Sequence, residues 1–272
     1  MLRHLRHIGS LILSLILAGN LFAQKDTSFR LLKSVKYNIV SFAVNNLGEI
    51  YLINADNQLK KLNEKGDSVG VFNEITKYGK LSYIDAQNPW RTLLYYGNFY
   101  NLVLLDKYLN VVGSIKLPQK NIFRAKAIST SYDNNIWVYD EQDYKLKKID
   151  ESGKLISATT DFRLLFDSLP SPTEIIDRDG FVYLYDPLKG LYVFDYYGLF
   201  KNRLTFLNWK DIVIVGKTIY GFDDKNYYSY SLGSLNLQQY PLPPFFKDGT
   251  SIKLGNNRIY VLKDNIINIY TP

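Results

Sequence analysis

Acidic side chains recur in short turn-forming segments along the chain. The candidates for metal binding are Asp56, Asp140, Glu141, Asp186, Asp223, Asp224 and Asp264. Carboxylates that converge from several chain segments supply the hard oxygen ligands that Ca²⁺ requires. Asp is also a residue that tight turns favour when no ligand is present. We take the turn role as the main interpretation and a Ca²⁺ site as its alternative, and we expect no other cofactor.

A second set of candidates is aromatic and basic, and it comes from the segments between the structural units predicted below. The set comprises Phe123, Arg124, Trp209, Phe245 and Phe246. Large apolar side chains on a protein surface mark contact sites for partners. Such side chains are also more often buried than exposed. Internal packing is therefore the favoured interpretation for the aromatic side chains, and a partner-binding site at these residues is the alternative.

Catalytic signatures are missing from residues 24–272. Both histidines, His4 and His7, precede this stretch, and the chain has no cysteine. This composition excludes a Ser-His-Asp triad, a Cys-His pair and a zinc site built from His or Cys. Adjacent acids on one loop, such as Asp140 and Glu141, lack the facing geometry of a glycosidase pair. We therefore predict a non-catalytic protein.

Residues 1–23 have the form of a secretion signal. Arg3 and Arg6 lie ahead of an apolar run at 8–17, and a small residue, Ala23, ends the segment. The run is too short for a stable membrane span, and an anchoring helix is the alternative interpretation. We expect cleavage and export. Because no Asn-x-Ser/Thr sequon follows, we expect a bacterial protein in the periplasm or at the outer membrane.

The charge of the exported part is modest. Removal of residues 1–23 lowers the count of Lys and Arg from 33 to 31 against 26 acids, which leaves a net charge of +5. The basic residues are interspersed with acidic ones rather than grouped, which is typical of a solvated surface. We therefore expect no nucleic-acid partner, and no membrane span after cleavage.

An apolar residue followed by an aromatic one recurs along the chain, usually just after an Asn, Asp or Gly turn. The copies are Ile50-Tyr51, Leu94-Tyr95, Ile136-Trp137, Val182-Tyr183, Ile219-Tyr220 and Ile259-Tyr260, with a mean spacing of about 42 residues. This period, with four short strands per unit, is typical of a β-propeller blade. The sequence predicts that residues 24–272 form a single, monomeric all-β domain, a six-bladed β-propeller of four-stranded antiparallel blades.

The predicted blades span 38–72, 81–117, 127–158, 173–205 and 211–242, with a sixth from 251. The sixth has only three strands, and an unmatched strand occurs at 29–37. Because an open ring would expose a sheet edge, we predict that this N-terminal strand pairs with the last blade and closes the ring. The loops between second and third strands, and the segments between blades, then meet on one face, called the linker face. Both candidate sets would lie there.

The clearest repeat motifs are Asn-Asn-Ile-Trp at 134–137, followed by Asp-Glu-Ser-Gly at 150–153, and Asp-Gly-Phe-Val-Tyr at 179–183. In these motifs the chain resembles six-bladed propellers of the NHL, TolB and regucalcin types, from about residue 29 onward. Lactonase-like members of such families hold a central Ca²⁺ with Glu, Asn and Asp, whereas non-enzymatic members are rigid platforms for proteins of the envelope. The resemblance implies either role.

We favour an exported, non-catalytic platform for a protein partner in the cell envelope. The first alternative is a Ca²⁺-dependent lactonase-like hydrolase or lyase that uses an acidic ring on the linker face. Carbohydrate binding through Tyr and Trp ranks below both, because Tyr is also a good strand former.

Overall fold

The computed structural model describes residues 29–255 and 257–271. The predicted signal segment, residues 1–23, lies outside them and stays a prediction. A compact unit spans Leu31–Thr271. In the part of the chain that the structure describes, no helix has the length and hydropathy needed to cross a bilayer.

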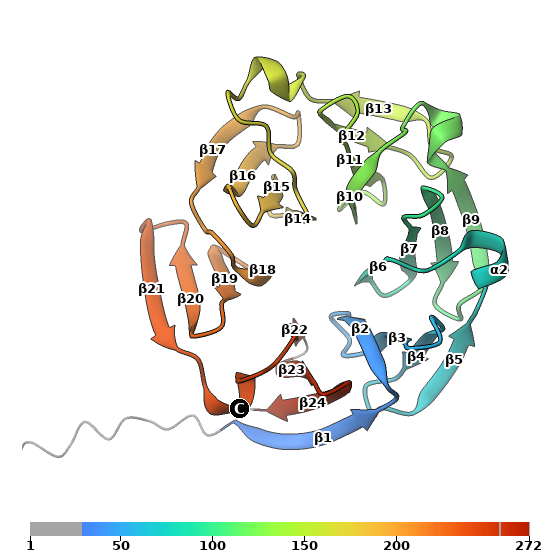
Figure 1. Cartoon of the computed structure of the whole chain (residues 1–272), viewed down its shortest axis with the longest axis vertical. Helices are drawn as coiled ribbons and strands as arrows, with labels where there is room; N and C mark the ends of the chain where they lie inside the picture. Colours follow the sequence, from blue (N-terminus) through green and yellow to red (C-terminus); the bar gives the residue numbers. More distant parts are fainter. Residues whose placement is uncertain (1–28, 256, 272) are drawn as a thin grey trace, which may run out of the picture. The chain divides into compact units, whose positions relative to one another are not determined.

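The first three blades are four-stranded antiparallel sheets whose strands follow one another in the chain (Figure 1). Blade 1 consists of β2 (Ile39–Val44), β3 (Ile50–Asn54), β4 (Leu59–Leu62) and β5 (Ser68–Phe72). Blade 2 consists of β6 (Tyr83–Asn88), β7 (Arg91–Tyr96), β8 (Asn101–Asp106) and β9 (Val111–Lys116). Blade 3 consists of β10 (Ala125–Thr130), β11 (Ile136–Asp140), β12 (Lys145–Ile149) and β13 (Leu155–Ala158).

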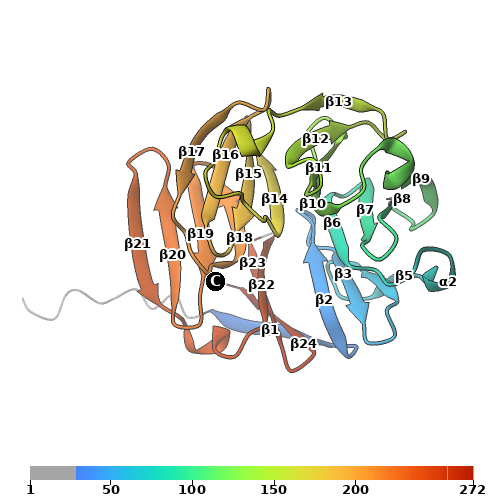
Figure 2. The same cartoon turned by 45° about the horizontal axis from the view of Figure 1, so that its top comes forward.

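Blades 4 and 5 repeat this arrangement. Blade 4 consists of β14 (Glu174–Arg178), β15 (Phe181–Asp186), β16 (Gly190–Asp195) and β17 (Phe200–Leu204). Blade 5 consists of β18 (Lys210–Val215), β19 (Thr218–Phe222), β20 (Asn226–Ser231) and β21 (Asn236–Pro241). The first strand of each blade lies nearest the centre of the ring and the fourth at its rim (Figure 2).

Blade 6 joins the two ends of the chain, as predicted. It contains β22 (Ser251–Gly255), β23 (Arg258–Lys263), β24 (Ile266–Thr271) and β1 (Arg30–Lys36). β1 lies beside β24 at the rim (Figure 1). Ser34 Oγ donates to Asn268 Oδ1 at 2.6 Å, and Val35 is buried. The six-bladed fold and its closure by the N-terminal strand are therefore confirmed.

Hydrophobic clusters fill each junction between neighbouring blades. In five of the six copies the aromatic residue of the repeated pair lies in these clusters, and Tyr51, Trp137, Tyr183 and Tyr260 are at most 1% exposed. Burial of one such side chain contributes about 1.5–3 kcal/mol. The repeat that reveals the fold is therefore the packing surface between blades.

Carboxylates on inner strands also tie neighbouring blades together. Asp85 of β6 accepts a hydrogen bond from the backbone N–H of Thr130 at 2.7 Å, and Asp211 of β18 accepts one from that of Ile252 at 2.8 Å. Asp177 of β14 accepts from indole and hydroxyl groups of blade 3. These buried bonds satisfy polar groups that would otherwise be costly between the sheets.

Short helical turns occupy segments between blades, on the linker face. They are α2 (Ile75–Tyr78), η2 (Leu117–Lys120), η3 (Phe162–Leu164) and η4 (Pro244–Phe246). Because the strands of a blade are antiparallel, the turns between first and second strands, and between third and fourth strands, lie on the opposite face. We call it the turn face.

Candidate functional site

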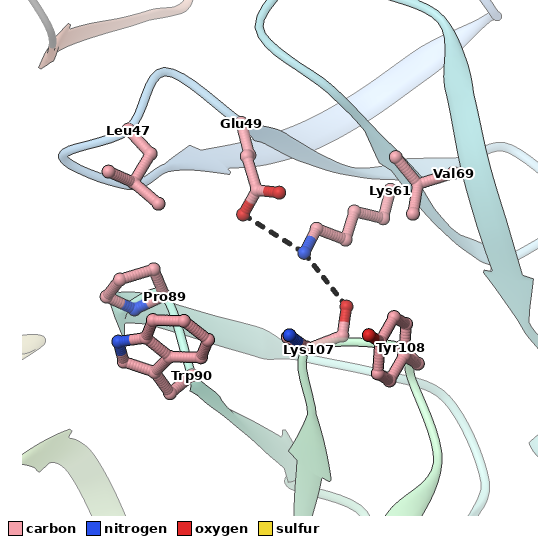
Figure 3. A pocket seen from close by; sticks show the side chains of 8 residues that line it. All are labelled: Leu47, Glu49, Lys61, Val69, Pro89, Trp90, Lys107 and Tyr108. Atoms are coloured by element: carbon pink, nitrogen blue, oxygen red, sulfur yellow. Dashed lines mark hydrogen bonds and ion pairs between the residues drawn. The ribbon is translucent and has the colours of Figure 1, made fainter.

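A groove lies between blades 1 and 2 on the turn face, and we call it the turn-face groove (Figure 3). Its volume is about 240 Å³. The lining residues are Leu47, Glu49, Lys61, Val69, Pro89, Trp90, Lys107 and Tyr108. Blade 1 supplies one wall from the β2–β3 turn, β4 and β5. Blade 2 supplies the other from its β6–β7 and β8–β9 turns, so the groove forms only when the blades pack together.

The floor of the groove is a buried ion pair. The ammonium of Lys61, 2% exposed, lies 3.0 Å from a carboxylate oxygen of Glu49 and donates to the carbonyl oxygen of Lys107 at 3.0 Å (Figure 3). It also lies 5.2 Å from the ring centre of Tyr51. Burial by itself lowers the pKa of Lys61, but the contacts with Tyr51 and Glu49 outweigh burial and raise it. Lys61 therefore stays charged and joins the two blades.

The mouth of the groove is aromatic and basic. The ammonium of Lys107 lies 4.9 Å from the ring centre of Trp90 and 4.8 Å from that of Tyr108. Trp90 is 65% exposed and Tyr108 is 67% exposed. Among the residues that the structure describes, no carboxylate is ion-paired with Lys107.

The nearest acid in the chain, Asp106, points its carboxylate into its own turn. It accepts from the backbone N–H groups of Tyr108 and Asn110, both at 2.8 Å. The side-chain amide of Asn110 is the main cause that lowers the pKa of Asp106, and the backbone bonds and the nearby charge of Lys107 lower it as well. Asp106 is thus occupied in holding the β8–β9 turn.

Most polar groups of this groove already have partners within the chain. Lys61 is charged, its partner Glu49 also accepts from the side-chain amide of Asn45 at 2.7 Å, and Lys107 is an ammonium between rings. A general base must present a free lone pair to the proton that it removes. The groove therefore offers an apolar, aromatic surface with one accessible positive charge, which suits binding.

A second groove lies on the linker face between blades 2 and 3, and we call it the linker-face groove. Its volume is about 320 Å³, and its lining residues are Tyr95, Gly97, Tyr100, Arg124, Ala125, Lys126 and Glu141. Glu141 forms ion pairs with Arg124 at 3.1 Å and with Lys126 at 3.2 Å. Phe123, beside Arg124 in the chain, is 43% exposed. The structure thus brings two sequence candidates, Arg124 and Glu141, into one groove.

The other aromatic candidates pack between blades. Trp209 is 6% exposed and stacks between Phe206, at 4.0 Å between ring centres, and Tyr228, at 4.7 Å. Phe246 is 9% exposed, and its ring meets that of Phe245 at 4.4 Å. A partner would not reach Trp209 or Phe246 unless the neighbouring side chains moved.

Most of the acidic candidates hold their own loops. Asp140 is buried and ion-paired with Lys147 at 2.8 Å. Asp186 accepts from the backbone N–H groups of Ser171 and Leu188, both at 2.8 Å. These bonds give each carboxylate a structural role.

The remaining acids come from three different loops, and only Asp223 and Asp224 are neighbours. Asp223 accepts from the hydroxyl of Tyr228 at 2.6 Å, and Asp224 is ion-paired with Lys210 at 2.5 Å. Asp56 and Asp264 are exposed on other blades. In residues 29–255 and 257–271, no three His, Cys, Asp or Glu side chains are grouped as metal ligands.

Sequence reasoning missed the acids of the inner strands. Burial raises the pKa of Glu174, the first residue of β14, to about 7; the charge of Lys253 opposes the shift and that of Asp211 reinforces it. Lys253 is itself ion-paired with Asp211. The available signal was an acid inside an otherwise apolar strand, such as Asp177 after Ile176 in β14, since such a position requires a buried partner.

No protein-family model matches the chain, and no curated protein matches it by sequence. Solved structures match its fold. A streptogramin B lyase is similar with a TM-score of 0.62 and 16% identity, over 86% of this chain and 79% of that one. The WD40 domain of Pan2 from Neurospora crassa is similar with a TM-score of 0.65 and 9% identity, over 89% and 94% of the two chains.

A third neighbour is PorZ of Porphyromonas gingivalis, described as an essential bacterial surface component of the type-IX secretion system. The TM-score is 0.57 and the identity 13%, over 82% of this chain and 29% of PorZ. The chain is a six-bladed β-propeller. At these identities the likenesses show the fold alone, and the neighbours include both enzymes and interaction domains.

Proposed function

We propose that this chain is an exported, non-catalytic β-propeller that binds a protein partner in the bacterial cell envelope through the turn-face groove. The observation that carries the proposal is Lys107 between the exposed rings of Trp90 and Tyr108, with no ion-paired carboxylate among the described residues. Aromatic side chains in a partly enclosed groove are the usual centres of binding energy in protein interfaces.

Two further features support a binding role. The large blade-to-blade core makes the ring a rigid support, so that a partner meets a preformed surface. The WD40 domain and a part of PorZ, a bacterial surface component, are similar to this chain in fold, although their identities to it are 9% and 13%. The export part of the proposal rests on the form of residues 1–23 in the sequence.

The alternative is a Ca²⁺-dependent hydrolase or lyase, and the likeness to a streptogramin B lyase is the observation in its favour. It requires carboxylates that are free to bind a metal ion. Asp140, Asp186 and Asp223 already hold their own loops, which weakens this alternative. A Ca²⁺-dependent rise in thermal stability that Asp140→Asn abolishes would support it.

A photo-crosslinker at the groove tests the binding proposal. We would replace Tyr108 with p-benzoylphenylalanine, irradiate intact cells, and identify the adducts by mass spectrometry. The matched control places the same crosslinker at Tyr197, which is 93% exposed on the turn face of blade 4. We expect one protein adduct at Tyr108, none at Tyr197, and loss of the adduct when Trp90→Ala is added. No adduct at Tyr108, or the same adducts at both sites, would refute a partner in this groove.

A further inference from the structure

We infer that the partner segment in the turn-face groove is an acidic peptide whose carboxylate pairs with Lys107 and whose neighbouring apolar side chain lies against Leu47 and Val69. This inference rests on the proposed function and names the chemistry of the partner. It follows from the charge balance and the wall composition of the groove.

Two other lysines that end on aromatic rings at the turn face are neutralised by acids of this chain. Lys61 lies over Tyr51 and has Glu49 as its carboxylate at 3.0 Å. Lys148 lies 5.0 Å from the ring centre of Trp137 and is ion-paired with Asp133 at 2.7 Å. Both have a carboxylate of this chain beside the ring.

Lys107 lies beside two rings, but among the described residues no carboxylate forms an ion pair with it. Its side chain is half-buried between Trp90 and Tyr108, so part of its hydration is already replaced by aromatic faces. A carboxylate brought by a ligand would form a charge-assisted hydrogen bond there, and this class of bond is about twice as strong as a neutral one. The groove is therefore complementary to a negatively charged group.

The walls favour a peptide over an acidic sugar. Leu47, 52% exposed, and Val69, 46% exposed, offer apolar surface and no hydrogen-bonding side chain. A sugar carries several hydroxyl groups that need hydrogen-bond partners. The carboxylate that lines the groove, that of Glu49, is already engaged by Lys61 and Asn45. The apolar side chain of a peptide would lie against these walls without placing a hydroxyl group on them.

The fluorescence of Trp90 can report binding in the groove. The chain has three tryptophans, of which Trp137 is 1% exposed and Trp209 is 6% exposed. Trp90, 65% exposed, is therefore the tryptophan whose emission a ligand changes by displacing water. We would titrate the full exported chain with a synthetic octapeptide library in which Glu or Asp stands beside Leu or Phe, and with a matched library in which Lys replaces each acid.

We expect a saturable blue shift of emission with acidic peptides and none with their Lys counterparts. Lys107→Gln should weaken binding about tenfold, the loss expected for a hydrogen bond to a charged group. The matched control is Lys217→Gln, which removes the same charge from an exposed turn of blade 5 on the same face and should leave the affinity unchanged.

Three outcomes would overturn the inference. The first is the absence of acid-dependent binding across the library, the second is equal weakening by both Gln variants, and the third is a blue shift with oligogalacturonate in place of peptides. The crosslinking result separates this inference from the proposed function. A Trp90-dependent adduct at Tyr108 without acidic-peptide binding keeps the platform and removes the acidic partner.

Discussion

Replacing Asp177 with Ala should destabilise the junction between blades 3 and 4 more than any loss of a surface acid. One carboxylate oxygen of Asp177 accepts from Ser131 Oγ at 2.7 Å and from Trp137 Nε1 at 2.8 Å. The other accepts from the hydroxyl of Tyr196 at 2.7 Å. Ser131 and Trp137 are buried, so their donors would lose an acceptor that water cannot easily replace.

The magnitude follows from those donors. Each buried donor left without a partner costs about 1–3 kcal/mol, and the hydroxyl of Tyr196, which is partly exposed, contributes less. Because the bonds share one carboxylate, the costs do not simply add, and we expect a loss of roughly 3–5 kcal/mol. For a protein of this size the melting temperature should fall by roughly 10 °C.

The assay is urea unfolding of the wild type and of Asp177→Ala, followed by circular dichroism and by tryptophan emission. The matched control is Asp167→Ala, which removes an exposed acid from the segment just before blade 4. It should change the free energy of unfolding by less than about 0.5 kcal/mol. A loss below about 1 kcal/mol for Asp177→Ala would refute the reasoning, because it would mean that the donors find other partners.

Two other substitutions test the inner strands and a blade turn. The pKa of Glu174 is raised from 4.5 to about 7, so the folded chain holds this proton more tightly than the unfolded chain. The free energy of unfolding should therefore fall as the pH rises from about 4.5 to 7, and Glu174→Gln should remove this pH dependence. The measurement is the melting temperature of both proteins as a function of pH. Parallel curves for the wild type and Glu174→Gln would contradict the prediction. Gly190 has φ of +101°, and an added Cβ would lie 2.2 Å from the carbonyl oxygen of Leu204, so Gly190→Ala should cost more than about 3 kcal/mol. The matched control is Gly180→Ala, because Gly180 has φ of +88° and open space around it. This substitution should lower the free energy of unfolding by about 1 kcal/mol in the same urea assay. Equal losses for Gly190→Ala and Gly180→Ala would contradict the steric argument.

The blades could be predicted from the sequence because each is encoded locally. The predicted boundaries 38–72 and 173–205 differ by one residue at most from β2–β5, which ends at Phe72, and from β14–β17, which ends at Leu204. Turn residues fix where strands end, and the alternation of apolar side chains fixes which side packs against the next blade. Ring closure could also be predicted. The sequence has one extra strand at its N-terminal end and a last blade that lacks one strand, so the two complete each other.

The turn-face groove could not be predicted in the same way. Trp90 and Glu49 belong to different blades, and their meeting depends on the angle at which blades 1 and 2 pack, which no local pattern records. In the sequence Trp90 follows Asn88 and Pro89, residue types that favour a turn. A tryptophan at a hairpin tip has no strand to pack under, so its exposure was the signal for a contact site.

Trp209 is buried rather than exposed, and the residue that indicates its burial, Gly221, lies in another part of the sequence. An added Cβ at Gly221 in β19 would come within 2.5 Å of the ring of Trp209, so the strand has no side chain where the indole lies. An isolated glycine inside a strand indicates the close approach of another group. Gly221 thus marked the site of an inserted ring, but only the packing of blade 4 against blade 5 shows that the ring is Trp209. Glycines inside strands and aromatic residues in turns should therefore be weighed together when a propeller is interpreted from sequence, because the first indicate which rings are buried and the second indicate which are free to bind.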